Sequence, residues 1–345
     1  MKLTKILIYL LFVCLAFGQL EKFSFAPLYL HDLIIVCILL LNHKALNFPK
    51  PVWFFLAACF LSLILAVFKL SFPTVLYSSL YLVRFASYAG LYPVIKSIKL
   101  NLKPWLLSFG LTVAGFGLLQ YLFLPDTRFL ASLNWDDHYF RVISTLADPA
   151  FVGAILVLTL ILIALKFKSR WYLGLPVLVA LFLTYSRSSY LSLLAAILGY
   201  AILKKKFKFL LLALVFLALP FLPRPGGEGV KLERLFSVTQ RLENYQAGLR
   251  IIKSAPLFGL GFNTLRFYRQ DFVSHAAAGL DNSFLFVAAT SGLVGLLAYL
   301  NLLRFLWKKS LLVKISLVAL IVHSFFQNTL FYPFVMIWLW SVIDS

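Results

Sequence analysis

Long apolar runs, separated by short polar connections, make up most of the chain. A helix of roughly twenty predominantly apolar residues is long enough to cross a bilayer. A window of that length predicts eleven or twelve membrane spans in this sequence. They are approximately residues 6–20, 26–41, 51–68, 74–95, 104–124, 149–165, 171–185, 189–203, 208–222, 284–303, 311–328 and 331–343. Several are short, so we expect some spans to tilt, break or lie partly at the interface.

The composition indicates the same class of protein. Hydrophobic residues make up 62% of the 345 residues, charged residues 13%, and the mean hydropathy is +0.93. A soluble domain is about half apolar and about a quarter charged. The apolar runs are also far longer than the roughly ten alternating residues of an outer-membrane strand. We therefore predict an all-α integral membrane protein with about 12 transmembrane helices and one long extracytoplasmic loop.

The first run has the order of charges that a signal peptide also shows, because Lys2 and Lys5 precede an apolar stretch that reaches Leu20. It contains no clear small-x-small cleavage site, and another span follows at once. We therefore interpret it as the first transmembrane helix.

Lysine marks one side of the predicted membrane protein. With the N-terminus in the cytoplasm, the inner connections carry 18 cations, of which 16 are lysine, and almost no acid. They are Lys2, Lys5, Lys44, Lys50, Lys96, Lys99, Lys103, Lys166, Lys168, Arg170, Lys204, Lys205, Lys206, Lys208, Arg304, Lys308, Lys309 and Lys314. This is the positive-inside pattern, and it predicts a multi-pass protein of the cytoplasmic membrane with its N-terminus in the cytoplasm.

Arginine dominates the remaining cations, which lie outside or within the membrane. Ten of these 14 are arginine: Arg84, Arg128, Arg141, Arg187, Arg224, Arg234, Arg241, Arg250, Arg266 and Arg269. Topology alone does not call for them, and the guanidinium fork is suited to phosphate oxygens. Ion pairs with outer acids such as Asp126 and Glu233 explain part of the set. The rest indicates a phosphate-bearing substrate outside the cytoplasm.

One connection is long enough to fold by itself. It divides the chain into spans at 1–222, an extracytoplasmic loop at 223–283 and spans at 284–345. The loop opens with the turn-rich stretch Pro223-Arg224-Pro225-Gly226-Gly227, which cannot continue the preceding span.

The pattern of the loop predicts an amphipathic helix from about Ser237 to Ser254, with Leu242, Tyr245, Leu249 and Ile252 on one face. It ends before Pro256, and Gly259 and Gly261 then mark a tight turn. On this helix Arg241 shares a stripe with Asn244 and the small Gly248, which let a ligand come close. Arg250 lies about half a turn of rotation away from Arg241, so one site is not expected to use both.

Two other arginines are singled out by their position. Arg187 lies at the outer junction of two spans, where it either faces substrate or extends to lipid headgroups. Arg84 lies in the middle of a span, where a charge is costly and normally faces a polar cavity or a partner. A structural pair with Asp32, the one acid found inside a predicted span, is the alternative to substrate binding.

Asp281 directly precedes the tenth predicted span. One interpretation is a helix N-cap, with the carboxylate accepting the N–H of Ser283 or Phe284. The other is a base near arginines that accepts a proton from an incoming hydroxyl. The two roles are compatible at different steps.

Weaker polar signals surround these residues. His275 is either a second base or a loop histidine, and His323, Gln327 and Asn328 form a stripe better suited to hydrogen bonds between helices. The adjacent Asp136 and Asp137 are a weak metal signal. The cysteines, Cys14, Cys37 and Cys59, lie within apolar runs without metal-like spacing, so we predict no disulfide framework and no metal site.

Four sequence segments, in order, resemble the hallmarks of the O-antigen ligase and polymerase superfamily. They are Ala147-Asp148-Pro149-Ala150; Ser186-Arg187; Arg241-Leu242-Glu243-Asn244-Tyr245 with Pro256-Leu257-Phe258-Gly259-Leu260-Gly261; and Asp281-Asn282-Ser283-Phe284-Leu285 with Gly292-Leu293-Val294-Gly295. The clear similarity covers about residues 140–300. Asp281 stands where ligases of the family usually have histidine, which favours a polymerase of surface polysaccharide over a lipopolysaccharide ligase.

The resemblance implies a helical bacterial glycosyltransferase that acts outside the cytoplasmic membrane. Its partners would be an undecaprenyl-diphosphate-linked glycan donor, a lipid-linked or lipid-anchored glycan acceptor and membrane lipids, with no nucleic acid. Arg187 and Arg241 would hold the diphosphate and Asp281 would activate the acceptor. Further candidates for substrate binding are Arg84, Asn282, Arg250, Arg266 and His275.

The residues are compatible with this chemistry. The donor is already activated, so we expect no cofactor, and arginines can stabilise the charge on the leaving diphosphate without a metal. In-line attack predicts inversion at the anomeric carbon. A flippase for lipid-linked sugars and a non-catalytic scaffold for envelope assembly are the alternatives. A flippase would place more charge in a central cavity and show internal repeats.

Overall fold

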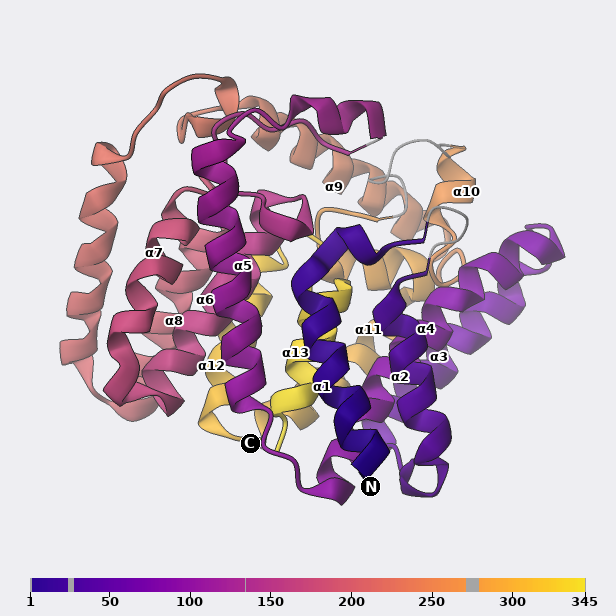
Figure 1. Cartoon of the computed structure of the whole chain (residues 1–345). Coiled ribbons are helices and arrows are strands. Elements are labelled where there is room, and N and C mark those ends of the chain that lie inside the picture. The colour runs from indigo at the N-terminus through magenta and orange to yellow at the C-terminus, as the bar shows by residue number, and fades with distance from the viewer. Residues whose placement is uncertain (1, 24–27, 134, 271–278, 345) are drawn as a thin grey trace.

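The computed structural model describes residues 2–23, 28–133, 135–270 and 279–344, and most of this part of the chain is helical (Figure 1). The α-helices are α1 (Lys2–Phe17), α2 (Leu30–Leu41), α3 (Lys50–Ala66), α4 (Phe72–Ile98), α5 (Lys103–Phe123), α6 (Pro149–Lys166), α7 (Gly174–Phe182), α8 (Arg187–Lys204), α9 (Phe236–Ser254), α10 (Leu265–Arg269), α11 (Ser283–Trp307), α12 (Leu311–His323) and α13 (Pro333–Val342). The 3-10 helices include η6 (Phe207–Phe221) and η9 (Thr329–Phe331). The all-helical prediction is confirmed for the described residues.

Within those ranges, four helices are both long and apolar enough to cross a membrane. They are α1 with its 3-10 extension to Glu21, α5, α6 and α11. Five more, α2, α3, η6, α12 and α13, are apolar but shorter. The chain is therefore a helical membrane protein, while the total of twelve spans stays a prediction.

Proline and capping side chains fix where many helices begin. Pro51, Pro73 and Pro104 lie in the first turns of α3, α4 and α5, where a missing N–H costs nothing and the fixed φ is already helical. The side chains of Asp148 and Asn282 accept hydrogen bonds from the first N–H groups of α6 and α11. Both types of residue are common at helix starts because they satisfy or remove the unpaired donors there.

The two ends of the helix bundle carry different cations. The N- and C-termini lie at one end, and α9 crosses the opposite end (Figure 1). At the end with the termini, the amines of Lys309 and Lys96 lie 2.9 and 3.5 Å from the carboxylate of Asp344. These lysines belong to two different connections that we predict to be cytoplasmic. Arg241, on α9, belongs to the other end.

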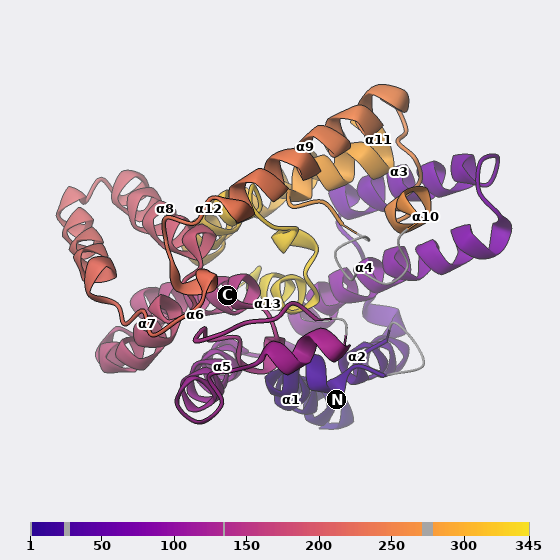
Figure 2. The ribbon, with the colours of Figure 1, turned by 90° about the horizontal axis from the view of Figure 1, so that it is seen from above.

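The centre of the bundle is formed by α13 (Figure 2). Every residue of α13 is buried, and it packs against α4, α6 and α12. In contrast, η6 contains no buried residue and packs against α8 at the edge of the bundle. Both segments are continuously apolar, so hydropathy alone does not tell the central helix from the peripheral one.

The helix α11 is interrupted at Gly292, whose φ of 65° and ψ of −166° lie outside the helical region. The turn that follows α9 supplies acceptors for the N–H groups freed by this break. Leu293 donates to the carbonyl of Pro256 at 2.8 Å. Val294 donates to the carbonyl of Leu257 at 3.2 Å. The break is tolerated because another part of the protein satisfies the freed backbone groups.

The same turn also donates hydrogen bonds to the break. Leu260 donates to the carbonyl of Ala289, and Gly261 donates to that of Thr290, both at 3.0 Å. Gly259 has a φ of 70°, and a Cβ on it would lie 2.3 Å from the carbonyl carbon of Thr290. A side chain does not fit there. The turn after α9 and the middle of α11 therefore form one interlocked unit, which fixes α9 relative to α11.

Candidate active site

The site is organised by α9, which crosses one end of the bundle and packs against α11 (Figures 1 and 2). The helix predicted from about Ser237 to Ser254 is present, with bounds Phe236–Ser254. Leu242 and Leu249 of the predicted apolar face are 58% and 50% exposed. Gly248, on the stripe of Arg241, is buried, and a Cβ on it would lie 3.1 Å from the side chain of Leu280. The stripe of Arg241 therefore faces the protein, and part of the apolar face points away from it.

Arg241 and Asn244 of α9 both reach the segments around α11 and α12. Nε of Arg241 donates to the carbonyl of Phe326 at 3.2 Å, and the guanidinium lies 5.9 Å from the centre of the ring of Phe326. Oδ1 of Asn244 accepts the backbone N–H of Asp281 at 3.1 Å. This contact fixes the backbone of Asp281 against the face of α9 that carries Arg241.

Asn282, not Asp281, is the N-cap of α11. Its Oδ1 accepts the N–H groups of Phe284 at 2.8 Å and of Leu285 at 3.0 Å, and its Nδ2 donates to the hydroxyl of Tyr245 at 2.9 Å. The capping role that we considered for Asp281 is therefore wrong. Asn282, predicted to bind substrate, uses its side chain for structure.

The carboxylate of Asp281 is left available by this arrangement. It is half-buried, and among the described residues it accepts no hydrogen bond. Burial raises the pKa of Asp281, while the charges of Arg241 and Arg269 act in the opposite direction. A carboxylate with a raised pKa is a stronger base than an exposed aspartate.

Arg187 is the first residue of α8, directly after the N-cap Ser186. Its Nη1 donates to the carbonyl of Leu232 at 3.1 Å. The start of α8 packs against the start of α6, where the hydroxyl of Ser189 donates to the carbonyl of Ala150 at 3.3 Å. Both helices thus present their positive ends at this side of the site, which favours an anion.

Arg234 lies near Arg187 and Arg241 and forms a cluster of arginines with them. The sequence did not single it out as a site residue. It donates to the carbonyls of Lys231 at 2.7 Å, Gly229 at 2.9 Å and Tyr185 at 3.1 Å. Burial, together with the nearby charges of Arg187 and Arg241, lowers the pKa of Arg234 to about 10. Arg187, Arg234 and Arg241 are therefore close enough to repel one another.

Arg141 is the second arginine that the sequence did not single out. Its Nε donates to the carbonyl of Thr184 at 2.9 Å. Burial lowers the pKa of Arg141 to about 9, and Arg234 contributes to the shift, while Asp148 opposes it. Neither Arg141 nor Arg234 lies in a hallmark segment. Their contacts with Thr184 and Tyr185 in the folded chain place them beside Arg187.

Asp148 adds a second carboxylate near the cluster. Its Oδ1 accepts the N–H groups of Ala150 at 2.7 Å and Phe151 at 2.9 Å. Burial raises the pKa of Asp148, and its charge in turn acts to raise the pKa of Asp281. Arginines 141, 187, 234 and 241 thus share their surroundings with the carboxylates of Asp148 and Asp281, and the charge of Asp136 also acts on both carboxylates.

Arg84 lies apart and is neutralised. It donates to Asp32 through Nε at 3.1 Å and through Nη2 at 2.7 Å. The guanidinium lies 5.4 and 5.5 Å from the ring centres of Tyr29 and Tyr81. The structural pair that we considered as the alternative for Arg84 is present, and substrate binding by Arg84 stays a prediction.

The remaining predicted residues lie at different depths. Arg250 is exposed on α9. The Nε of Arg266 is buried and has no hydrogen-bond partner among the described residues. His275 lies outside the described residues. His323 is fully buried and contacts the hydroxyls of Ser189 at 3.1 Å and Thr329 at 2.6 Å. The predicted role of His323 in hydrogen bonds between helices is confirmed, since it links α12 to α8.

The described residues contain no group of three or more His, Cys, Asp or Glu side chains that could hold a metal ion. Asp136 and Asp137 therefore gain no further ligand of these types within that part of the chain. The cysteines Cys14, Cys37 and Cys59 carry free thiols. Phosphate binding here would rest on arginine, and the prediction of a metal-free site stays a prediction.

Comparison with known proteins concerns the sequence of this stretch. No curated protein matches the chain. A model of the O-antigen ligase family matches residues 172–300, less than half of the chain. The match begins after Asp148, so the first of the four hallmark segments lies outside it. The predicted resemblance to the O-antigen ligase family is confirmed for the stretch that carries Arg187, Arg241 and Asp281.

Proposed function

We propose that this protein transfers a glycan from an undecaprenyl-diphosphate carrier to a sugar hydroxyl of an acceptor, at the outer face of the cytoplasmic membrane. The observation that carries the proposal is the partly buried cluster of Arg141, Arg187, Arg234 and Arg241. Partly buried charges of one sign repel one another, and a bound anion relieves this repulsion. A diphosphate supplies several negative charges and accepts hydrogen bonds from guanidinium groups.

The reaction follows from where charge develops. The oxygen of the acceptor hydroxyl attacks the anomeric carbon, and the bond from that carbon to the diphosphate oxygen breaks. The electron pair of the broken bond leaves with the diphosphate, where Arg187 and Arg241 stabilise it. Charges placed in advance in a partly buried site are more effective than they would be in water. In-line displacement inverts the anomeric configuration.

Asp281 is the proposed base of this reaction. It orients the acceptor hydroxyl and takes its proton as the new bond forms, after which the proton passes to solvent. Its raised pKa supports this role, since a more basic carboxylate accepts the proton more readily. Asn244 is a positioning residue, because it holds the backbone N–H of Asp281 at 3.1 Å.

The proposal extends to the kind of product. Aspartate at the position where ligases of the family usually have histidine favours polymerisation of a surface polysaccharide over ligation. The same site would serve either reaction, because both cleave the bond between a sugar and a diphosphate.

Purified protein incubated with a polyprenyl-diphosphate oligosaccharide tests the proposal. Longer lipid-linked chains and released carrier are expected from a polymerase, and transfer to a different acceptor from a ligase. The activity should persist in EDTA. Asp281→Ala should abolish transfer, and Arg241→Ala should lower its rate about 100- to 1000-fold, while both variants still insert and fold. Unchanged substrate, or full activity of Asp281→Ala, would contradict the proposed site, and movement of intact substrate across a vesicle membrane would show a flippase.

A further inference from the structure

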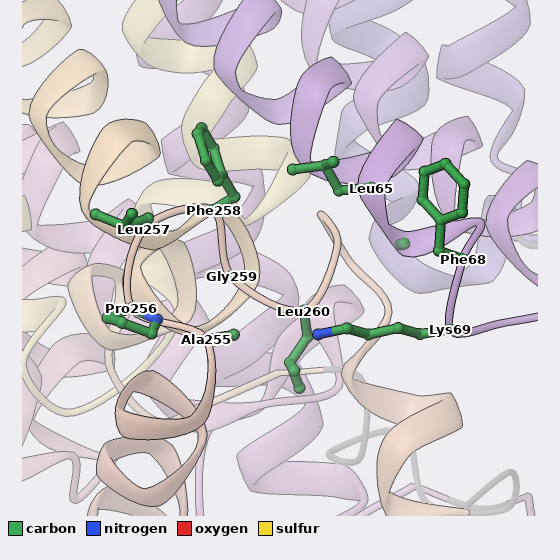
Figure 3. A pocket seen from close by; sticks show the side chains of 10 residues that line it. Leu65, Phe68, Lys69, Ala255, Pro256, Leu257, Phe258, Gly259 and Leu260 are labelled. Carbon is green, nitrogen blue, oxygen red and sulfur yellow. The ribbon is translucent and has the colours of Figure 1, made fainter.

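A pocket of about 400 Å³ lies between the end of α3 and the turn that follows α9 (Figure 3). One wall is formed by Leu65, Ala66, Phe68 and Lys69, and the other by residues 255–260. At 1.5 Å per residue along α9, the 14 residues from Arg241 to position 255 separate the pocket from the arginine cluster by roughly 20 Å. The pocket is therefore distinct from the candidate active site.

Apolar side chains dominate the pocket and its surroundings. Phe68 is 84% exposed and Leu257 is 57% exposed. The apolar surface continues along α3 at Ile64 and along α11 at Leu293 and Leu297, all exposed, and these two helices pack against each other. In a helical membrane protein such a surface faces acyl chains.

Among the described residues that line the pocket, Lys69 is the one that carries a charge. Its side chain extends from the end of α3 toward Leu260 in the opposite wall (Figure 3). Within the described ranges, Lys69 forms no ion pair, whereas Lys231, another lysine of the same end of the bundle, pairs with Glu228 at 2.5 Å. An ammonium group at the edge of an apolar pocket is complementary to an amphiphile with an anionic head.

We propose that this pocket binds an anionic phospholipid of the surrounding bilayer, with its phosphate at Lys69 and an acyl chain between Leu65 and Leu257. A single ammonium group matches the single charge of a phosphodiester, whereas a diphosphate carrier calls for several cations, as in the arginine cluster. The occupant is therefore a bilayer lipid and not the glycan donor.

A lipid in this pocket would also affect how α3, the turn after α9 and α11 are held together. Its wall at residues 255–260 is the turn that fills the break in α11, and Leu260 donates to the carbonyl of Ala289 there. On the opposite side, the hydroxyl of Ser62 on α3 donates to the carbonyl of Thr290 at 2.6 Å. A bound lipid would contact the end of α3 and the turn, which are both hydrogen-bonded to α11, and would hold the three segments together.

The test uses the purified full chain in nanodiscs of phosphatidylcholine, with or without phosphatidylglycerol of the same acyl chains. Phosphatidylglycerol is expected to raise the melting temperature and to remain bound in native mass spectrometry. One lysine near the membrane contributes about 1 kcal/mol to binding of anionic lipid, so Lys69→Gln should weaken this binding about fivefold. Lys253→Gln removes an exposed lysine from α9 and should leave it unchanged.

A second variant tests the pocket without changing its charge. Leu65→Trp fills the apolar space and should also reduce binding of phosphatidylglycerol, while glycan transfer or the melting temperature in phosphatidylcholine reports that the protein is folded. Equal effects of Lys69→Gln and Lys253→Gln, or equal binding of both phospholipids, would overturn the proposal. So would displacement of phosphatidylglycerol by a lower concentration of polyprenyl phosphate. These readouts measure lipid binding, so they are independent of the proposed transfer reaction.

Discussion

Arg84 and Arg241 are the same kind of residue in two different settings. Arg84 is fixed by two hydrogen bonds to Asp32, and the side chains of this pair are only 11% and 9% exposed. Arg241 donates to the backbone carbonyl of Phe326. In the part of the chain that the structure describes, it forms no salt bridge with a carboxylate. A carbonyl orients a guanidinium but does not neutralise it.

The difference shows which arginines are ready for an anion. A guanidinium that is paired with a carboxylate needs no bound anion to neutralise it. Replacing either member of such a pair leaves the charge of the other uncompensated. Arg234 and Arg141 resemble Arg241, since both donate to carbonyls, and their pKa values are lowered to about 10 and about 9. An anion bound among them would relieve both the burial of charge and the mutual repulsion. The structure thus distinguishes an arginine that is paired with a carboxylate from arginines that donate to backbone carbonyls.

The largest expected effect concerns the neutralised pair. Arg84→Leu leaves Asp32 with the hydroxyl of Tyr88 at 2.5 Å and the N–H of Tyr29 at 2.9 Å, but without its cation. We expect a loss of about 3–5 kcal/mol in the free energy of unfolding. Thermal or denaturant unfolding in a fixed detergent measures it.

The double variant is the control. Arg84→Leu combined with Asp32→Leu removes both charges and should recover much of the lost stability, because a hydrophobic pair can replace a buried ion pair. If Arg84→Leu instead kept its stability and lost glycan transfer, Arg84 would belong to the substrate site, as its position in the sequence first suggested.

The next effect is on catalysis and compares two arginines of one helix. Arg241→Ala should lower the rate of glycan transfer about 100- to 1000-fold, the usual cost of removing a group that stabilises charge in the transition state. Arg250→Ala, at an exposed position of α9, should leave the rate close to that of the unmodified protein. Similar losses in both variants would mean that the charge of the whole helix, and not the position of Arg241, supports the reaction.

Some of the fold and site could be predicted because the signal is local. Pro149 and Pro104 mark helix starts, and the apolar runs that follow them give the bounds of α6 and α5 within one or two residues. The period of α9 and its end before Pro256 also follow from neighbouring residues. The hallmark segments identify the stretch that the family model later matches.

Other features depend on contacts between distant segments. Nothing near Arg234 in the sequence shows that it reaches the carbonyl of Tyr185. The sequence also did not show that Asn282, and not Asp281, caps α11, because either side chain can cap a helix. In the folded protein, Asn244 on α9 accepts the backbone N–H of Asp281, and this contact between distant segments accompanies capping by Asn282. The interlocking of Gly259 with the break at Gly292 joins two segments that a local pattern treats separately.

The smallest expected effect is a shift in the dependence of activity on pH. Asp281 must be ionised to accept a proton, so transfer should decline as the pH falls through its pKa. The charge of Arg269 acts to lower the pKa of Asp281 against the effect of burial. Arg269→Gln removes that charge and should move the acidic limb of the pH profile to higher pH. Arg269→Lys retains a positive charge and should leave the limb near its original position.

The direction of this shift separates two roles for Asp281. If Asp281 serves as the base, the limb moves to higher pH in Arg269→Gln, and activity at a pH well above the limb changes little. If Asp281 only shapes the start of α11, its titration does not govern the rate, and the limb stays where it is in both variants. Arg269 also donates to the carbonyl of Gly279 at 3.0 Å, so a structural effect of its loss would lower activity at every pH without moving the limb.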